Sequence, residues 1–148
     1  MSELPAQLRE WRQRGQFASV DGVELFYRTA GTEQSGRPWL VCFHGFPTSS
    51  WDWHLILPGL AKTHRVLVFD FPGYGLSEKT PSRDYSLKRQ LDAAQALMAR
   101  LDIQSFDLMA HDMGNSVGCE LLRRRELGDF PFQLRSLTLL NGGIYMDL

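Results

Sequence analysis

An aspartate lies between small residues at a point where an apolar, strand-like segment meets a helical pattern. Residues 110–114 read Ala-His-Asp-Met-Gly, with Asp112 at the centre. Small residues two positions before and after the aspartate let a strand and a helix approach closely, and the sharp turn lifts the central side chain above the sheet. The pattern is that of a nucleophile elbow with aspartate in the serine position. The following helix would direct its positive dipole end at Asp112, which favours a carboxylate.

Taken alone, an aspartate between a strand and a helix is more typical of an ordinary N-cap. A second segment favours the nucleophile, because His44 and Gly45 follow another expected strand. The backbone N–H of Phe46 can serve as one donor of an oxyanion hole and that of Met113 as the other. Asp112, Phe46 and Met113 are therefore the predicted catalytic residues.

Short apolar runs alternate with helical patterns along the chain. Strands buried in a parallel sheet are expected over 39–43, 65–69, 105–110 and 137–140. Strands over 17–20 and 23–29, joined by Asp21 and Gly22, predict an antiparallel hairpin before them. Helices are expected over 4–14, 53–60, 87–101 and 115–127. This order predicts an α/β fold with helices on both faces of the sheet and ligands at the carboxyl ends of its strands.

The composition indicates one globular domain. The 148 residues carry a net charge of −1, which leaves no basic surface for nucleic acid or an anionic membrane. Cys42 and Cys119 lack metal-ligand spacing and favour a reducing, cytoplasmic compartment. The sequence shows no signal peptide and no run long enough to span a membrane, and we expect neither a metal nor a cofactor.

The motifs resemble those of the α/β-hydrolase fold family, in its haloalkane dehalogenase and epoxide hydrolase branch. The sequence FHGFPTSS at 43–50 is similar to that branch's oxyanion loop, DFPGYGLS at 70–77 to its turn after the fourth strand, and HDMG at 111–114 to its aspartate elbow. The first motif together with NGGI at 141–144 also resembles the mesoderm-specific transcript proteins. The likeness runs from about residue 20 to residue 144.

The resemblance implies a small-molecule substrate. An aspartate that attacked an ester would form an unstable anhydride, whereas attack on a saturated carbon forms an alkyl ester that water, activated by a histidine, can hydrolyse. Halide displacement and epoxide opening therefore both remain open. The expected substrate-binding residues are His44, Phe46, Trp51, His111 and Met113. Of these, His44 usually fixes the conformation of its loop, and Trp51 is alternatively a helix-packing residue. Asp70 is expected to fasten its own turn.

Two positions depart from the dehalogenase pattern. Dehalogenases of this branch usually hold the halide with a tryptophan at the position of Met113, and many add an asparagine at the position of Phe46. Neither Met113 nor Phe46 has a side chain that can donate such a hydrogen bond. The Phe46-Pro47 pair instead resembles epoxide hydrolases, in which tyrosines of a cap domain activate the epoxide oxygen.

Members of this family are about twice as long as the chain. They place a cap after the sixth strand and the base histidine after the last strand. Residues 1–148 are therefore expected to form the N-terminal portion of a single domain, without the cap, the later strands, the base or the acid, and to be inactive in isolation. None of His44, His54, His64 and His111 is a good candidate for the base.

Two alternatives to an incomplete enzyme remain. One is an inactive hydrolase-like chain that acts as an interaction module, and the other is a split enzyme whose second chain supplies the cap and the histidine. The apolar strand over 137–140 would leave an unpaired sheet edge. Since such edges associate readily, we expect self-association or a partner strand there.

Overall fold

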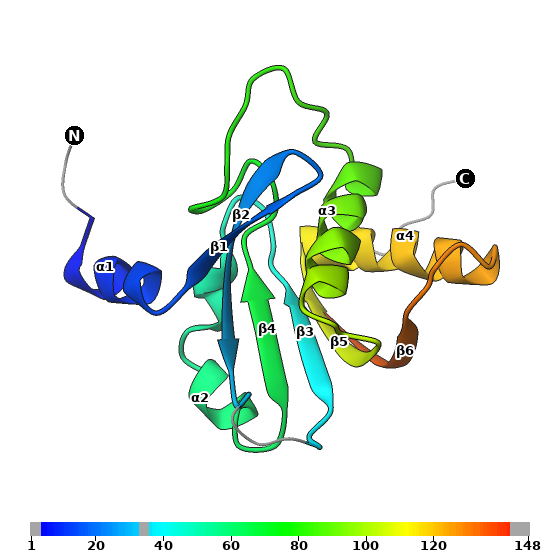
Figure 1. Cartoon of the computed structure of the whole chain (residues 1–148), viewed down its shortest axis with the longest axis horizontal. Helices are drawn as coiled ribbons and strands as arrows, with labels where there is room; N and C mark the ends of the chain where they lie inside the picture. Colours follow the sequence, from blue (N-terminus) through cyan, green and yellow to red (C-terminus); the bar gives the residue numbers. More distant parts are fainter. Residues whose placement is uncertain (1–3, 33–35, 143–148) are drawn as a thin grey trace.

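The structure, a computed structural model, describes residues 4–32 and 36–142 and contains a six-stranded sheet (Figure 1). The strand order is β1-β2-β4-β3-β5-β6. The hairpin strands β1 and β2 are antiparallel to each other, β2 is antiparallel to β4, and the remaining pairs are parallel. The strands are β1 (Gln16–Val20), β2 (Val23–Ala30), β3 (Trp39–Phe43), β4 (Arg65–Phe69), β5 (Ser105–His111) and β6 (Gln133–Leu140). The predicted α/β fold with a mostly parallel sheet is confirmed.

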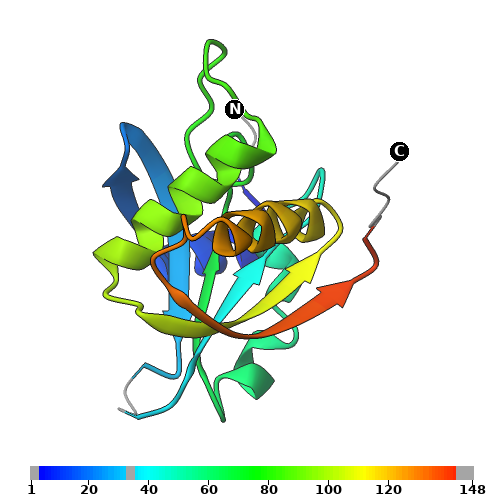
Figure 2. The same cartoon turned by 90° about the vertical axis from the view of Figure 1, so that its right-hand side faces the viewer.

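Helices cover both faces of this sheet, as expected (Figure 2). One face carries α3 (Leu87–Arg100) and α4 (Met113–Glu126), and the other carries α1 (Ala6–Gln13), the 3-10 helix η1 (Ser50–Trp53) and α2 (Leu57–Leu60). Every residue of β3 is buried because its side chains alternate between two apolar clusters. Val41 and Phe43 face the α3–α4 side, whereas Leu40 and Cys42 face the α1–α2 side.

The turn between β1 and β2 has the predicted residues and geometry. Asp21 and Gly22 both have positive φ, +47° and +71°, and Val20 pairs directly with Val23. Two consecutive positive φ values are typical of a type I′ hairpin turn, which matches the twist of the flanking strands. Aspartate and glycine are among the residues that adopt these angles most readily, so the sequence specifies this turn locally.

The helix predicted over 53–60 is wrong as a continuous element. The structure has η1, which ends at Trp53, and then the separate short helix α2 beginning at Leu57. Pro58 has no backbone N–H and is tolerated only in the first turn of a helix. A new helix therefore begins beside it instead of continuing through it.

The sixth strand is also longer and less buried than predicted. β6 begins at Gln133, four residues before the expected start at Leu137, and Leu140 is 37% exposed. β6 is the edge of the described sheet and pairs with β5 alone. An edge strand with one solvated face accommodates polar residues such as Arg135 and Ser136, and a search for continuous apolar runs overlooks such a segment. The expected unpaired edge is present among the described residues.

The other predicted elements agree to within a few residues at their ends. The strands over 39–43 and 65–69 are confirmed without change, and α4 begins two residues earlier than expected, directly after Asp112. Of the late NGGI segment, Asn141 and Gly142 are described, while residues 143 and 144 lie outside the described residues.

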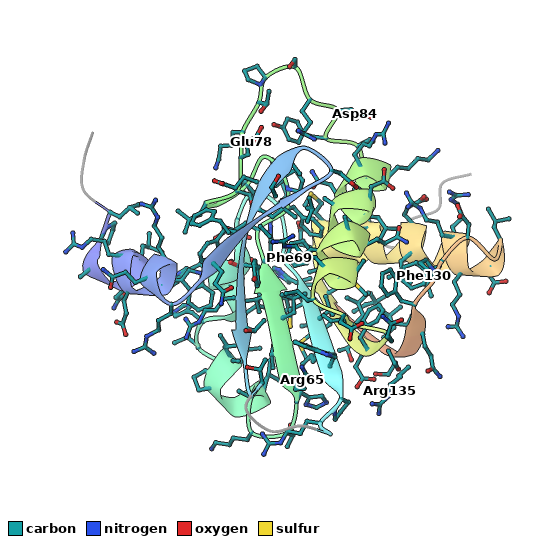
Figure 3. The ribbon with its side chains drawn as sticks, viewed as in Figure 1. Arg65, Phe69, Glu78, Asp84, Phe130 and Arg135 are labelled. Carbon is teal, nitrogen blue, oxygen red and sulfur yellow. The ribbon has the colours of Figure 1, made fainter. Side chains whose placement is uncertain are left out.

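The long segment between β4 and α3 is fastened to β2. The hydroxyl of Ser77 accepts a hydrogen bond from the amide of Phe26 at 2.9 Å and donates one to the carbonyl of Asp70 at 2.6 Å. The amide of Glu24 donates to the carboxylate of Glu78 at 3.0 Å. Figure 3 labels Glu78 in this segment, which rises beyond the ends of the strands. These bonds fix the turn that contains Tyr74.

Candidate active site

Asp112 lies at the sharp turn between β5 and α4. Its φ is +52°, an uncommon value for a residue other than glycine. Close packing around the turn explains the small neighbouring residue, because a Cβ added at Gly114 would lie 2.5 Å from the carbonyl oxygen of Phe43. A Cβ at Gly45 would lie 2.7 Å from that of Asp112. The loop after β3 and the elbow after β5 are therefore in direct contact, as the sequence predicts.

Both predicted oxyanion donors bind the same oxygen of Asp112. The amide of Phe46 donates to Oδ1 at 2.7 Å, and the amide of Met113 donates to Oδ1 at 2.6 Å. Oδ2 accepts no hydrogen bond from any described residue. The Phe46 amide, followed by the Met113 amide, lowers the pKa of Asp112 below its usual value, because both bonds favour the charged carboxylate. Asp112 is also the N-cap of α4, and its role as a nucleophile stays a prediction.

His44 links the loop after β3 to the turn after β4. Its side chain is fully buried, and both ring nitrogens bind backbone groups. Nε2 accepts a hydrogen bond from the amide of Phe71 at 3.0 Å, which leaves the proton on Nδ1 to be donated to the carbonyl of Gly45 at 2.8 Å. Burial lowers the pKa of His44 and favours this neutral ring. The geometry gives His44 the loop-fixing role, and a direct substrate contact stays a prediction.

Asp70 connects two turns at the same edge of the sheet. Its Oδ1 accepts from the amide of Ser50 at 2.7 Å and its Oδ2 accepts from the amide of Leu76 at 2.6 Å. The predicted role in fastening its own turn is confirmed. The bond to Ser50 adds a second role, since it ties the turn after β4 to the segment that follows the oxyanion loop.

Two further predicted substrate-binding residues flank this arrangement. His111 approaches Gly45, and its Nδ1 lies 3.9 Å from Oδ2 of Asp52. Trp51 stacks on His54 at 3.9 Å between ring centroids and meets the ring of Trp11 edge-on at 5.3 Å. These contacts give Trp51 the helix-packing role. A substrate contact for His111 or Trp51 stays a prediction.

Tyr74 is a candidate site residue that the sequence analysis missed. Its hydroxyl donates to the sulfur of Met113 at 3.3 Å, and its ring meets that of Phe46 edge-on at 6.3 Å between centroids. Burial and then the negative charge of Asp112 raise the pKa of Tyr74. Tyr74 lies between two glycines in a turn at the carboxyl end of β4, a position that could have identified it.

A family model describing the alpha/beta hydrolase fold matches residues 38–147. The chain belongs to the alpha/beta hydrolase fold family. A mesoderm-specific transcript homolog protein of Bos taurus is 37% identical over 98% of the chain and 44% of its own length. The resemblance stated from the motifs is thereby confirmed. The chain spans less than half the length of the curated relatives it matches.

Solved structures give the same family and the predicted branch. A haloalkane dehalogenase DbeA-M1 loop variant from Bradyrhizobium elkanii superposes with a TM-score of 0.73 and 34% identity, covering 84% of this chain and 39% of that one. The epoxide hydrolase CorEH gives a TM-score of 0.72 and 27% identity, covering 86% of this chain and 42% of that one. The chain thus resembles solved structures of both a haloalkane dehalogenase and an epoxide hydrolase.

In this member of the alpha/beta hydrolase fold family, no histidine among residues 4–32 and 36–142 is hydrogen-bonded to Asp112. Both ring nitrogens of His44 bind backbone groups, His54 stacks on Trp51, and His64 lies 3.9 Å from Asp107. His111 adjoins Asp112 along the chain but faces Asp52. The described residues therefore place two backbone amides, but no histidine, on the carboxylate of Asp112.

Other features of this alpha/beta hydrolase fold lie apart from Asp112. A cavity of about 800 Å³ runs along α3 beside the β1–β2 hairpin, and Asp112 is not among its lining residues. The described residues contain no group of three His, Cys, Asp or Glu side chains that could hold a metal ion. No described helix combines the length and apolar character needed to cross a bilayer.

Proposed function

We propose that Asp112 is the nucleophile of a hydrolase that forms an alkyl-enzyme ester on a small epoxide or haloalkane. The observation that supports this is the pair of amides on one carboxylate oxygen. Oδ1 is held by Phe46 and Met113, which leaves Oδ2 free to attack. A structural N-cap needs one such bond, whereas two converging amides from separate loops are typical of an oxyanion hole.

The reaction follows from this arrangement. Oδ2 donates an electron pair to a saturated carbon, and the bond from that carbon to the halide or epoxide oxygen breaks with its electron pair on the leaving atom. Oδ1 then becomes the carbonyl oxygen of the ester. When water adds to the carbonyl carbon, negative charge develops on Oδ1, where the amides of Phe46 and Met113 already point.

The second half of the reaction needs a base that the described residues do not position. We therefore expect the 148-residue chain to form the ester and to hydrolyse it slowly. A protein that carries a suitably placed histidine beyond these residues, or in a second chain, would complete the cycle. Accumulation of the ester makes the first step directly observable by mass.

The test is intact-mass analysis after incubation with a panel of terminal epoxides and 1-haloalkanes, followed by peptide mapping. We expect one substrate-derived mass on Asp112 and none in Asp112→Asn. Asp102→Asn is the matched control, because Asp102 also has a positive φ, +54°, and is exposed. Labelling that persists in Asp112→Asn, or no labelling of the unchanged chain by any compound, would contradict the proposal.

A second candidate function is interaction through the edge of β6. The supporting observation is that β6 pairs with β5 on one side and with no described strand on the other. A half-exposed apolar edge favours pairing with a strand of a second copy or of another protein. Sedimentation analysis of the purified chain tests this, and a monomer at all concentrations without a bound partner would contradict it.

A further inference from the structure

Next to the proposed nucleophile, a phenol hydroxyl is bonded to a thioether. Tyr74 donates to the sulfur of Met113, the residue directly after Asp112. We propose that Tyr74 is the acid of the alkylation step and gives its hydroxyl proton to the oxygen of an epoxide bound at Asp112. This inference rests on the proposed function, because it names the group that assists the leaving atom in the first step.

The present partner of Tyr74 is easily replaced. A thioether sulfur is a weak acceptor, whereas an oxygen that is gaining negative charge is a strong one. A substrate oxygen that approached the hydroxyl would therefore displace the sulfur of Met113 at little cost. The side chain of Met113 lacks a donor of its own, so the hydroxyl of Tyr74 supplies what the residue after the nucleophile cannot.

The electrostatic setting keeps the proton on Tyr74. Burial and the charge of Asp112 raise the pKa of the phenol, so the hydroxyl is protonated at neutral pH. The neighbouring ring of His44, 5.4 Å away between centroids, is held neutral by burial. The hydroxyl is placed beside the elbow by its bond to Met113, the residue that follows Asp112.

A cavity of about 410 Å³ opens beside these residues. Its lining residues are Phe46, Gly73, Tyr74, Lys79, Thr80, Pro81 and Tyr85. The lining connects it to the elbow through Phe46, whose amide binds Asp112, and through Tyr74. Asp112 itself does not line the cavity, so the cavity would hold the body of a small organic substrate whose reactive end extends past Phe46 and Tyr74 to Asp112.

The other side-chain donors of this cavity are already bound to strong acceptors. The ammonium of Lys79 donates to the carbonyls of Gly75 and Ser77 at 2.6 and 3.0 Å. The hydroxyl of Thr80 donates to the carboxylate of Glu78 at 2.5 Å. The hydroxyl of Tyr85 donates to the carbonyl of Thr80 at 2.9 Å. By contrast, the hydroxyl of Tyr74 donates to a weak acceptor, the sulfur of Met113.

The step balances as follows. Oδ2 of Asp112 forms a bond to the epoxide carbon, the carbon–oxygen bond breaks, and its electron pair goes to the epoxide oxygen. That oxygen takes the proton of Tyr74 and becomes a hydroxyl, because an alkoxide is far more basic than a phenolate. The tyrosinate then takes a proton from water. With an alkyl iodide, the iodide leaves with the electron pair and needs no proton.

The experiment compares rates of ester formation on Asp112 in the unchanged chain, Tyr74→Phe and Tyr27→Phe. Each protein is treated with a terminal epoxide and, separately, with a 1-iodoalkane of similar length, and the adduct is followed by mass. General acid catalysis contributes 10²–10⁴-fold. We therefore expect Tyr74→Phe to slow the epoxide reaction at least tenfold and the iodide reaction less than threefold. Tyr27→Phe, the matched control, removes a hydroxyl that donates to Gln16 outside this cavity and should match the unchanged chain.

The pattern of rates distinguishes the possible failures. Equal slowing with both substrates in Tyr74→Phe would assign Tyr74 a merely structural role and overturn the inference. No slowing with the epoxide would overturn it while leaving the proposed function intact. Failure of the unchanged chain to form any ester would overturn both. Circular dichroism of each variant checks that the fold is retained.

Discussion

The amide of Phe46 donates a 2.7 Å hydrogen bond to Oδ1 of Asp112, a residue 66 positions later in the chain. This bond joins the loop after β3 to the elbow after β5, two strands that are neighbours in the parallel sheet. The contact is possible because Gly45 has no Cβ to collide with Asp112. This hydrogen bond thus brings the second amide to Oδ1, completes the proposed oxyanion hole and leaves Oδ2 without a hydrogen bond from the described residues.

The first prediction concerns the pH dependence of ester formation. In the proposed reaction the carboxylate of Asp112 is the reactive form, and the amides of Phe46 and Met113 lower its pKa. The rate with a 1-iodoalkane, whose leaving group needs no proton, should therefore be constant from neutral pH down through the usual aspartate range. It should fall only at lower pH, as the carboxylate becomes protonated.

The measurement is the initial rate of mass increase on Asp112 at a series of pH values at which circular dichroism shows a folded chain. A rate that already falls by half between pH 7 and pH 5 would show that the two amides do not favour the carboxylate. The same series on Asp102→Asn checks that the profile does not depend on a surface carboxylate.

The second prediction compares two glycines of α4. A Cβ at Gly114 would lie 2.5 Å from the carbonyl oxygen of Phe43, whereas a Cβ at Gly118 would meet its nearest neighbour, the side chain of Leu108, at 3.8 Å. Gly114→Ala should lower the free energy of unfolding by about 1–3 kcal/mol, because the backbone of β3 must shift. Gly118→Ala should raise it by about 1 kcal/mol, because alanine favours the helix and fits.

Urea unfolding of both variants measures the two changes in the free energy of unfolding. The opposite signs are the essential result, since both substitutions add the same methyl group to the same helix. Two destabilised variants would mean that the space beside Gly118 is smaller than the structure indicates. Two stabilised variants would mean that the elbow and β3 are less closely packed.

Much of the site can be predicted from local sequence. The small residues around Asp112 specify the elbow, and the apolar run over 39–43 specifies the strand whose following loop contains Phe46. The turn at Asp21 and Gly22 follows from residue types that tolerate positive φ. These features depend on residues adjacent in the chain, so a single sequence contains the information.

Features that depend on distant contacts could not be predicted in this way. The bond from Tyr74 to Met113 joins residues 39 positions apart, and that from Ser50 to Asp70 joins residues 20 positions apart. β6 has polar residues where a buried strand would have apolar ones, because its environment is set by its place at the sheet edge. Such contacts become visible only once the sheet order is known.

The third prediction concerns Glu120 on α4. Hydrogen bonds from Arg123 and then Arg124 lower its pKa to about 2. A carboxylate whose pKa is lower in the folded state than in the unfolded state stabilises the fold above about pH 4.5, and this contribution is lost as the pH falls toward 2. The unchanged chain should therefore be more stable than Glu120→Gln at pH 7 by up to about 1 kcal/mol, because partly exposed pairs are screened by solvent.

Urea unfolding at pH 7 and pH 3 checks the sign. The difference between the unchanged chain and Glu120→Gln should shrink at pH 3, where the unfolded carboxyl group is protonated. Glu126→Gln, an exposed position at the end of the same helix, should show a much smaller difference at either pH. A difference at Glu120 that grows at low pH would contradict the assignment.

The last prediction tests the connection that supports the oxyanion loop. Asp70 is 1% exposed, and each of its carboxylate oxygens accepts from a backbone amide, that of Ser50 or that of Leu76. In Asp70→Asn one of these amides would face an NH₂ group, and a buried donor would be left without an acceptor. We expect unfolding free energy to fall by about 3 kcal/mol. Asp84→Asn is the control, because Asp84 is exposed, accepts hydrogen bonds from Ser86 two residues away and forms a solvent-exposed ion pair with Arg89 at 3.9 Å. If the two variants were equally stable, Asp70 would not hold the turns together, and the loop that carries Phe46 would depend on His44 alone for its support from the turn after β4.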